Sequence, residues 1–181
     1  MAPEQIRRLL DFKPRVNGEK RLHTLACLLL DSGLRINEAL SLRSDDVDLD
    51  NFLLRVHGKG GKDRVVPISY EMRKLMWRWL RTQQGGGGLV FSTRGGTKLN
   101  YHNTLGDFKR LGNRLHITGV RFSFHTLRHT FAVNYIRNGG DVFRLQRILG
   151  HTTLEMTRRY VNLQKSDLQA VHSKLSLLSR R

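Results

Sequence analysis

Two short apolar segments joined by a turn constrain the fold of this chain most strongly. Residues 52–56 and 64–68 are rich in the branched and aromatic side chains that favour β-strands. The six residues between Val56-His57 and Arg64 are Gly58-Lys59-Gly60-Gly61-Lys62-Asp63, a composition typical of a hairpin tip. The sequence therefore predicts one antiparallel hairpin, and residues 89–91 are a candidate for a third short strand.

Most of the remaining chain has the periodicity of α-helices. Helices are predicted at residues 3–10, 19–30, 35–42, 70–81, 101–115, 126–138, 141–149, 153–160 and 166–178. Pro3 suits a first helical position, and Gly33 is the expected stop of the second helix. The predicted fold class is therefore α+β, mainly α-helical with a small antiparallel sheet. The glycine run at residues 85–88 is expected to be a flexible connector and has no functional explanation.

The charge of the chain indicates a polyanionic partner. Its 181 residues carry a formal net charge of +17, and the pI is near 11.2. No apolar run approaches the roughly 20 residues of a membrane span, and no secretory signal peptide opens the chain. Nucleic acid is therefore favoured over an anionic membrane surface.

The sequence gives little support for redox chemistry, metal binding or nucleotide binding. Cys27 lies in an apolar segment and is expected to be buried, and a single cysteine allows no disulfide framework. His125 and His129 have the spacing of a zinc-binding helix, but the glutamate of the H-E-x-x-H pattern is missing. Residues 58–62 do not match the P-loop pattern. No metal and no cofactor are expected.

His125 and Arg128 are candidates for phosphate binding. They stand three residues apart at the start of a predicted helix, so both project from one face in its first turn. The amides of a helix N-terminus favour a phosphate at the same place. A solvated basic helix face explains this pair equally well when it is taken alone.

His151 and Tyr160 follow on the same C-terminal third. His151 comes directly after Leu149-Gly150, where the dipole of the preceding helix favours a protonated imidazole. Tyr160 lies nine residues further on, inside a predicted helix beside two arginines. Each residue alone would be an ordinary loop histidine or packing tyrosine. A phenol of pKa about 10 attacks at neutral pH only with a base or with cations nearby.

Together with Arg35, far upstream, these side chains suit one task. Two arginines clamp the oxygens of a phosphodiester and stabilise the negative charge of its transition state. In order and spacing the set resembles the catalytic residues of the tyrosine recombinases, also called the phage-integrase family. That family shows Gly-Leu-Arg-x-x-Glu, a lysine on a hairpin, His-x-x-Arg, Leu-Gly-His and a nucleophilic tyrosine. The matching residues of this chain are Arg35, Lys59, His125, Arg128, His151 and Tyr160.

The resemblance spans residues 3–160, and the five elements are specific because they occur in this order. It implies the fold of the family's catalytic domain and site-specific DNA recombination. It also implies that Arg35 and Arg128 hold the non-bridging oxygens of the scissile phosphate and that His151 donates a further hydrogen bond. Glu38 is expected to support Arg35 or its helix rather than to act in the chemistry.

The same resemblance assigns the proton transfers. Lys59 would protonate the departing 5′ oxygen as general acid, and His125 would orient Tyr160 or accept its proton. Tyr160 would form a 3′-phosphotyrosyl link and release a 5′ hydroxyl. The partner strand's 5′ hydroxyl would then reverse the reaction without ATP or metal.

Two other functions compete with this interpretation. A non-catalytic DNA-binding module would use residues 126–149 as a helix-turn-helix. That reading explains the charge but leaves Arg35, Lys59, His151 and Tyr160 as coincidences. A type IB topoisomerase would use similar tyrosine chemistry to relax supercoils, and the Leu-Gly-His element and the short hairpin favour a recombinase instead.

The resemblance also implies how the protein is organised. Family members usually carry an N-terminal helical domain that clamps the other face of DNA. Residues 1–181 are expected to be the catalytic domain without that domain. Apolar residues at helical spacing in the tail, residues 163–181, either pack on their own domain or dock on a neighbouring protomer. The expected partners are double-stranded DNA and further copies of the chain, a tetramer on recombining sites, in a prokaryotic cytoplasm.

Overall fold

The computed structural model describes residues 1–58, 61–83 and 88–151. The chain forms two compact units, Met1–Phe131 and Ala132–Arg181, and each is described by itself. Within the described residues the secondary structure consists of α-helices, a short 3-10 helix and one small sheet. The predicted fold class is therefore confirmed. Among the described helices, none has both the length and the apolar composition needed to span a bilayer.

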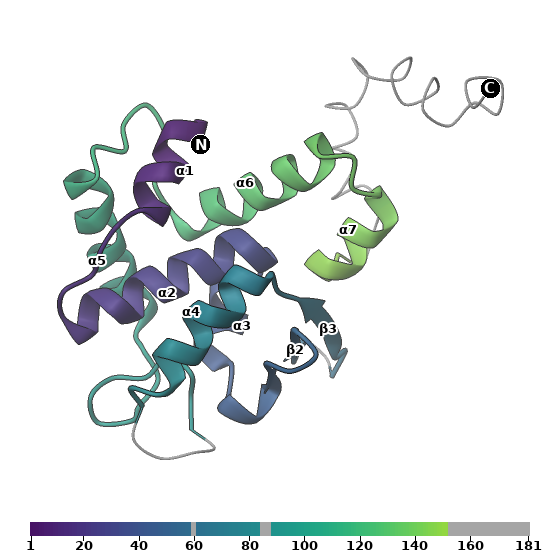
Figure 1. Ribbon diagram of the computed structural model, residues 1–181, viewed down its shortest axis with the longest axis horizontal. Coiled ribbons are helices and arrows are strands. Elements are labelled where there is room, and N and C mark those ends of the chain that lie inside the picture. The colour runs from purple at the N-terminus through teal and green to yellow at the C-terminus, as the bar shows by residue number, and fades with distance from the viewer. Residues whose placement is uncertain (59–60, 84–87, 152–181) are drawn as a thin grey trace, which may run out of the picture. The chain divides into compact units, whose positions relative to one another are not determined.

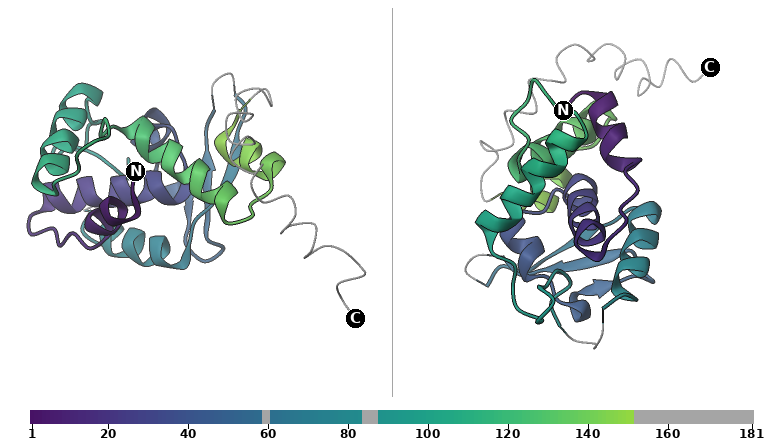
Figure 2. Two further views of the ribbon diagram at one scale, coloured as in Figure 1. Left: turned by 90° about the horizontal axis from the view of Figure 1, so that it is seen from above. Right: turned by 90° about the vertical axis from the view of Figure 1, so that its left-hand side faces the viewer.

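Helix α2 (Asn17–Ser32) is the centre of the first unit. Four helices contact it: α1 (Pro3–Leu10), α3 (Ile36–Ser41), α4 (Tyr70–Leu80) and α5 (Tyr101–Arg114) (Figure 1). The right-hand view of Figure 2 looks along α2 and shows other helices around it. Every residue from His23 to Leu29 is buried, as expected of a helix that is covered on all sides.

Cys27 lies in this buried stretch of α2, so its expected burial is confirmed. Burial, and next the nearby Asp31 carboxylate, raise the pKa of the Cys27 thiol to about 12. The thiol is therefore protonated at neutral pH and is a poor nucleophile.

The predicted hairpin is present and belongs to a three-stranded antiparallel sheet. Its strands are β1 (Val47–Asp48), β2 (Leu53–Val56) and β3 (Arg64–Pro67), in the order β1-β2-β3. Leu54 pairs with Val66, and both are fully buried, whereas Arg55 and Val65 form the next pair and face outward. This alternation is that of a sheet with one face packed on a core. Residues 59–60 of the hairpin tip lie outside the described residues.

The third strand is not the one that the sequence indicated. Leu89 forms only an isolated bridge with Arg43, while β1 occupies the sheet edge. The segment after Leu89 is used for core packing instead. Val90 and Phe91 are fully buried, and Phe91 stacks on Trp79 of α4 with 6.2 Å between the ring centroids. Trp79 also donates its indole N–H to the carbonyl of Val90 over 2.8 Å.

Most predicted helices are confirmed within a few residues of their ends. Helix α2 begins two residues earlier and ends two residues later than predicted. Gly33 ends it in the left-handed conformation, with φ of 64°, which is the role expected of this glycine. Arg35 is the N-cap residue of α3 rather than part of that helix. Phe52, predicted as a strand residue, has φ of 59° and belongs to the turn before β2.

Two further helices follow α5. Helix α6 (Phe124–Arg137) contains the boundary between the two units, and α7 (Val142–Leu149) belongs to the second unit. The side chain of Asp141 caps α7 by accepting the backbone N–H of Arg144 over 2.8 Å. The helices predicted at residues 153–160 and 166–178 lie outside the described residues.

Stacked aromatic rings fix the start of α6 on α5. The ring of Phe108 lies 4.0 Å from that of Phe122 and 4.9 Å from that of Phe124, measured between centroids. All three side chains are buried. Gly112 makes this packing possible, because the Phe122 ring occupies the space that a Cβ atom would fill.

We expect Gly112→Ala to lower the free energy of unfolding by about 1–3 kcal/mol, because the added methyl group collides with the Phe122 ring. Gly18→Ala is the matched control, since Gly18 is also helical and its Cβ would meet nothing within 4 Å. That control should be neutral or stabilise by up to about 1 kcal/mol. Denaturant unfolding of both variants measures the difference. Equal effects would contradict the packing of Phe122 against α5.

Candidate active site

Arg128 connects the start of α6 to the end of α2. Its side chain is buried, with 7% exposure, and Nη1 donates to the carbonyl oxygen of Gly33 over 2.6 Å. Gly33 stands two residues before Arg35. Residues that are 95 positions apart in the chain are thereby joined, and Arg128 is anchored on the segment that carries Arg35.

Arg35 stands at the N-terminus of α3 and remains partly accessible. Its backbone N–H donates to Oε2 of Glu38 over 2.8 Å, and its Nη1 donates to Oε1 over 3.0 Å. The Arg35 side chain is 42% exposed, whereas that of Glu38 is only 9% exposed. The prediction that Glu38 supports Arg35 and its helix is confirmed.

Glu38 has a second cationic partner that the sequence did not reveal. Arg64, the first residue of β3, donates Nη1 to Oε1 over 2.9 Å and Nη2 to Oε2 over 2.8 Å. Burial alone would raise the pKa of the Glu38 carboxyl, but hydrogen bonds from Arg64 and from Arg35 hold that pKa below its usual value. The carboxylate is therefore charged at neutral pH. No local pattern predicts a pair whose members are 26 residues apart.

His125 is exposed in the first turn of α6, three residues before Arg128. The predicted helix start is confirmed, but the two side chains have different environments. Arg128 lies beside the buried Phe124 and Leu127 on the packed side of the helix, while His125 is open to solvent. The exposed imidazole of His125 can meet a ligand that approaches from solvent.

Lys59 lies outside the described residues, but the two ends of its hairpin are described. His57 joins them to the preceding 3-10 helix η1 (Ser44–Asp46). Its Nδ1 lies 2.9 Å from Oδ2 of Asp63, and its Nε2 lies 3.1 Å from Oδ1 of Asp46. The imidazole thus links both ends of the hairpin loop to the segment before β1. This link was not predicted.

His151 belongs to the second unit. It follows Gly150, which ends α7 in the left-handed conformation, as the sequence indicated. The backbone N–H of His151 donates to the carbonyl of Gln146 over 3.1 Å, and the Gln146 amide donates to the carbonyl of His151 over 3.3 Å. These two bonds fix the residue at the C-terminal end of α7. Tyr160 lies outside the described residues.

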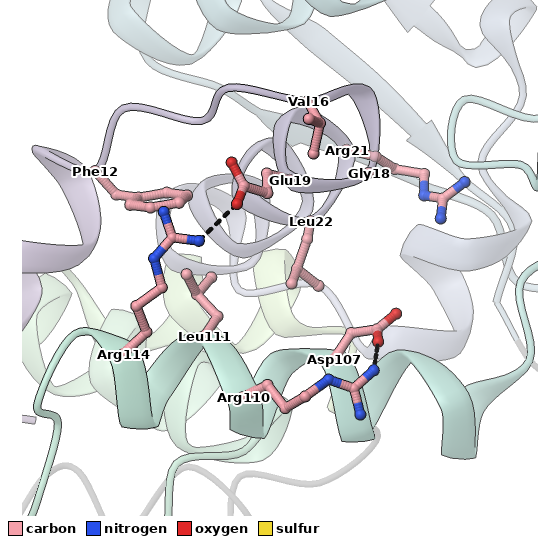
Figure 3. A pocket seen from close by; sticks show the side chains of 10 residues that line it. All are labelled: Phe12, Val16, Gly18, Glu19, Arg21, Leu22, Asp107, Arg110, Leu111 and Arg114. Atoms are coloured by element: carbon pink, nitrogen blue, oxygen red, sulfur yellow. Dashed lines mark hydrogen bonds and ion pairs between the residues drawn. The ribbon is translucent and has the colours of Figure 1, made fainter.

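A separate pocket lies between the first turns of α2 and helix α5 (Figure 3). Four of its charged side chains form two ion pairs, Arg114 with Glu19 and Arg110 with Asp107. The fifth, Arg21, donates to the carbonyl of Ser92 over 2.6 Å. Helix α2 has 16 residues, so it is roughly 24 Å long, and Gly33 follows its other end. The pocket is therefore distinct from the site around Arg35 and Arg128.

The described part of the chain contains no group of three side chains suited to hold a metal ion. Arg35, Arg64 and Arg128 lie within one unit, and Glu38 and the Gly33 carbonyl fix their orientation. Guanidinium groups held in this way are suited to bind a phosphate.

The sequence profile of the Phage integrase family matches residues 1–167. The chain belongs to this family. A phage integrase relative, tyrosine recombinase XerA of Thermococcus kodakarensis, is 34% identical over 184 residues, covering 99% of this chain and 64% of the relative. Tyrosine recombinase XerC of Pseudomonas putida is 36% identical over 148 residues, covering 80% of this chain and 49% of the relative. The chain thus spans about half to two thirds of the length of these relatives.

Solved structures of phage integrase relatives have the same fold. A crystal structure of XerA recombinase superposes with a TM-score of 0.80 at 26% identity, covering 96% of this chain and 64% of that one. The catalytic domain of bacteriophage HP1 integrase gives a TM-score of 0.71 at 26% identity, covering 99% of this chain and 96% of that domain. The fold that the sequence resemblance implied is confirmed.

We expect the pKa of His57 to lie above its ordinary value of 6.5, because the Asp63 and Asp46 carboxylates stabilise the imidazolium. The pKa of His57 is thus higher in the folded state than in the unfolded chain. The imidazolium therefore stabilises the folded state fully below about pH 6.5, and this stabilisation is lost as pH rises through the folded-state pKa. An NMR titration of the His57 ring protons measures this pKa. Asp63→Asn should lower it, and an unchanged value in that variant would contradict the pairing.

Proposed function

We propose that this chain cleaves and rejoins double-stranded DNA at specific sites through a 3′-phosphotyrosyl intermediate. The observation that carries the proposal is the bond from Arg128 to the carbonyl of Gly33, two residues before the partly exposed Arg35. Two arginines from distant parts of the sequence are thereby associated with one short segment. The net charge of +17 supports a nucleic acid as the substrate.

In this proposal the cations bind the scissile phosphate. Arg35 and Arg128 hold its non-bridging oxygens and stabilise the charge that these oxygens gain in the transition state. An arginine has five N–H donors, so Arg128 can serve both the Gly33 carbonyl and a phosphate. His151 donates a further hydrogen bond to the phosphate. Its place after the end of α7 favours the protonated imidazole that this role requires.

Tyr160, His125 and Lys59 carry out the bond exchange. The phenol oxygen of Tyr160 bonds to phosphorus while the bond from phosphorus to the 5′ oxygen breaks. The phenol proton passes to His125, and Lys59 gives a proton to the 5′ oxygen, which leaves as a hydroxyl. One phosphate ester replaces another, so attack by a partner strand's 5′ hydroxyl restores a phosphodiester without ATP or metal.

The relatives support DNA as the substrate. A crystal structure of the XerH site-specific recombinase bound to its difH substrate, a pre-cleavage complex, gives a TM-score of 0.79 at 25% identity. It covers 96% of this chain and 53% of that one. The family match and these relatives do not favour a non-catalytic helix-turn-helix module or a DNA-relaxing topoisomerase.

We extend the proposal to assembly and location. The chain would act as the catalytic domain of a recombinase, as a tetramer on recombining sites, in a prokaryotic cytoplasm at the nucleoid. The tail at residues 163–181 would dock on a neighbouring protomer and couple cleavage between subunits. That tail lies outside the described residues.

We expect Tyr160→Phe to abolish covalent capture of DNA and to leave DNA binding intact, because only the attacking oxygen is removed. The measurement uses a nicked suicide substrate, from which a denaturing gel separates the protein–DNA adduct. The conservative Tyr135→Phe variant is the control, since Tyr135 stands on α6 and has no part in the proposed chemistry. An undiminished adduct with Tyr160→Phe would refute the assignment of the nucleophile.

We also expect DNA affinity to decrease steeply with salt, because phosphate contacts supply most of it. Each neutralised phosphate contributes about −0.9 to the slope of log affinity against log salt concentration. Fluorescence anisotropy over a range of salt concentrations measures this slope, with an unrelated duplex of the same length as the control. Affinity that does not change with salt would count against an electrostatic interface.

A further inference from the structure

We propose that Arg64 is a positioning residue, which holds Glu38 in place so that Glu38 in turn orients Arg35 toward the scissile phosphate. Arg64 touches no substrate in this scheme. The inference rests on the proposed function for the importance of Arg35, but the link between the three side chains is independent of it.

The hydrogen bonds at Glu38 show why this carboxylate is a fixed support. Oε1 accepts from Nη1 of Arg35 and from Nη1 of Arg64, over 3.0 and 2.9 Å. Oε2 accepts from the backbone N–H of Arg35 and from Nη2 of Arg64, both over 2.8 Å. Each oxygen therefore uses both of its lone pairs. The carboxylate cannot rotate without losing contacts on both sides.

The exposed fraction of the side chain increases from Glu38 to Arg64 to Arg35. Glu38 is 9% exposed and Arg64 13%, whereas Arg35 is 42% exposed. The bidentate pair is thus the less exposed part, and Arg35 extends from it toward solvent. A buried ion pair is weak evidence for stability, because desolvation offsets most of its attraction. The fixed geometry of the Arg64–Glu38 pair explains its presence better than a gain in stability does.

The net charge of the cluster formed by Arg35, Glu38 and Arg64 is a second argument for the positioning role of Arg64. Arg35 and Glu38 alone would form a neutral pair, in which the guanidinium is drawn onto the carboxylate. With Arg64 the three groups carry a formal charge of +1. Because Arg64 occupies both carboxylate oxygens, the attraction of Glu38 for Arg35 is shared, and the cluster still attracts an anion.

The sheet explains why residue 64 can perform this task. Arg64 pairs with Val56 in the register of β2 and β3, and the Leu54–Val66 pair two positions along is fully buried. The backbone of Arg64 is therefore held by the hairpin. The planar fork of its guanidinium matches the two carboxylate oxygens, which the point charge of a lysine cannot do.

The first test observes Arg35 directly and needs no activity. In the wild-type chain, the Nε–Hε group of Arg35 should give a sharp NMR signal with restricted motion. Arg64→Ala should lower its order parameter to below about 0.6. Arg78→Ala, which removes an exposed arginine from α4, is the charge-matched control and should leave the signal unchanged. An Arg35 signal that is unchanged in Arg64→Ala would overturn the proposal.

The second test measures covalent cleavage in single-turnover reactions on a nicked substrate. Arg64→Ala should slow cleavage by about 10–100-fold, as expected when a supporting hydrogen-bond partner is lost, with little change in the dissociation constant for DNA. In an Arg35→Ala background, Arg64→Ala should cause no further loss, because it acts through Arg35. An equal loss in both backgrounds would overturn the proposal.

Arg64→Lys provides a second variant in case Arg64→Ala does not fold. It keeps the charge but not the fork, so Arg35 order and cleavage rate should both decrease while thermal unfolding stays close to that of the wild type. If the order of Arg35 and the cleavage rate both stay at their wild-type values in Arg64→Lys, the proposal is overturned. The two hypotheses can fail separately. If the wild-type protein forms no covalent adduct with DNA but Arg35 becomes mobile in the Arg64 variants, only the proposed function is refuted.

Discussion

The hydrogen bond from Arg128 to the carbonyl of Gly33 is the interaction on which the rest of the candidate site depends. Gly33 ends α2 in a left-handed conformation, and the chain then turns toward Arg35. Arg128 enters from α6, whose start is fixed by Phe108, stacked on Phe122 and packed at a tilt against Phe124. A buried guanidinium needs polar partners, and a helix C-terminus offers carbonyls that lack intrahelical partners. This contact therefore gives each group a polar partner and joins the start of α6 to the residue that follows α2.

A protein that binds a polyanion must keep many positive charges without letting its own carboxylates neutralise them. The Glu38 cluster solves this locally by placing two arginines on one carboxylate, so that positive charge remains in excess. The pocket beside α5 shows the opposite arrangement, because each of its pairs contains one acid and one base. The two places differ in how carboxylates and arginines are matched: Glu38 serves two arginines, whereas each carboxylate of the pocket pairs with one.

Local rules predicted the parts of the fold that depend on neighbouring residues. The hairpin follows from two β-prone segments around a glycine-rich turn, and the end of α2 follows from Gly33. The support of Arg35 by Glu38 was also predictable, because the two stand three residues apart at a helix start. The third strand was mistaken because residues 89–91 are apolar enough for either a strand or the core. Packing against Trp79 of α4 placed this segment in the core, and that contact joins two elements across a connecting loop, which periodicity does not predict.

The sequence by itself determined the chemistry available to this protein: an excess of cations, a family-like order of arginines, histidines and a tyrosine, and helices separated by glycines. Only the tertiary structure decided which of these groups meet. The contacts of Arg128 with Gly33 and of Arg64 with Glu38 span 95 and 26 residues. Helical periodicity and capping act over about four residues. Contacts over longer separations exist only once the packing of α2 against its neighbours has brought the segments together.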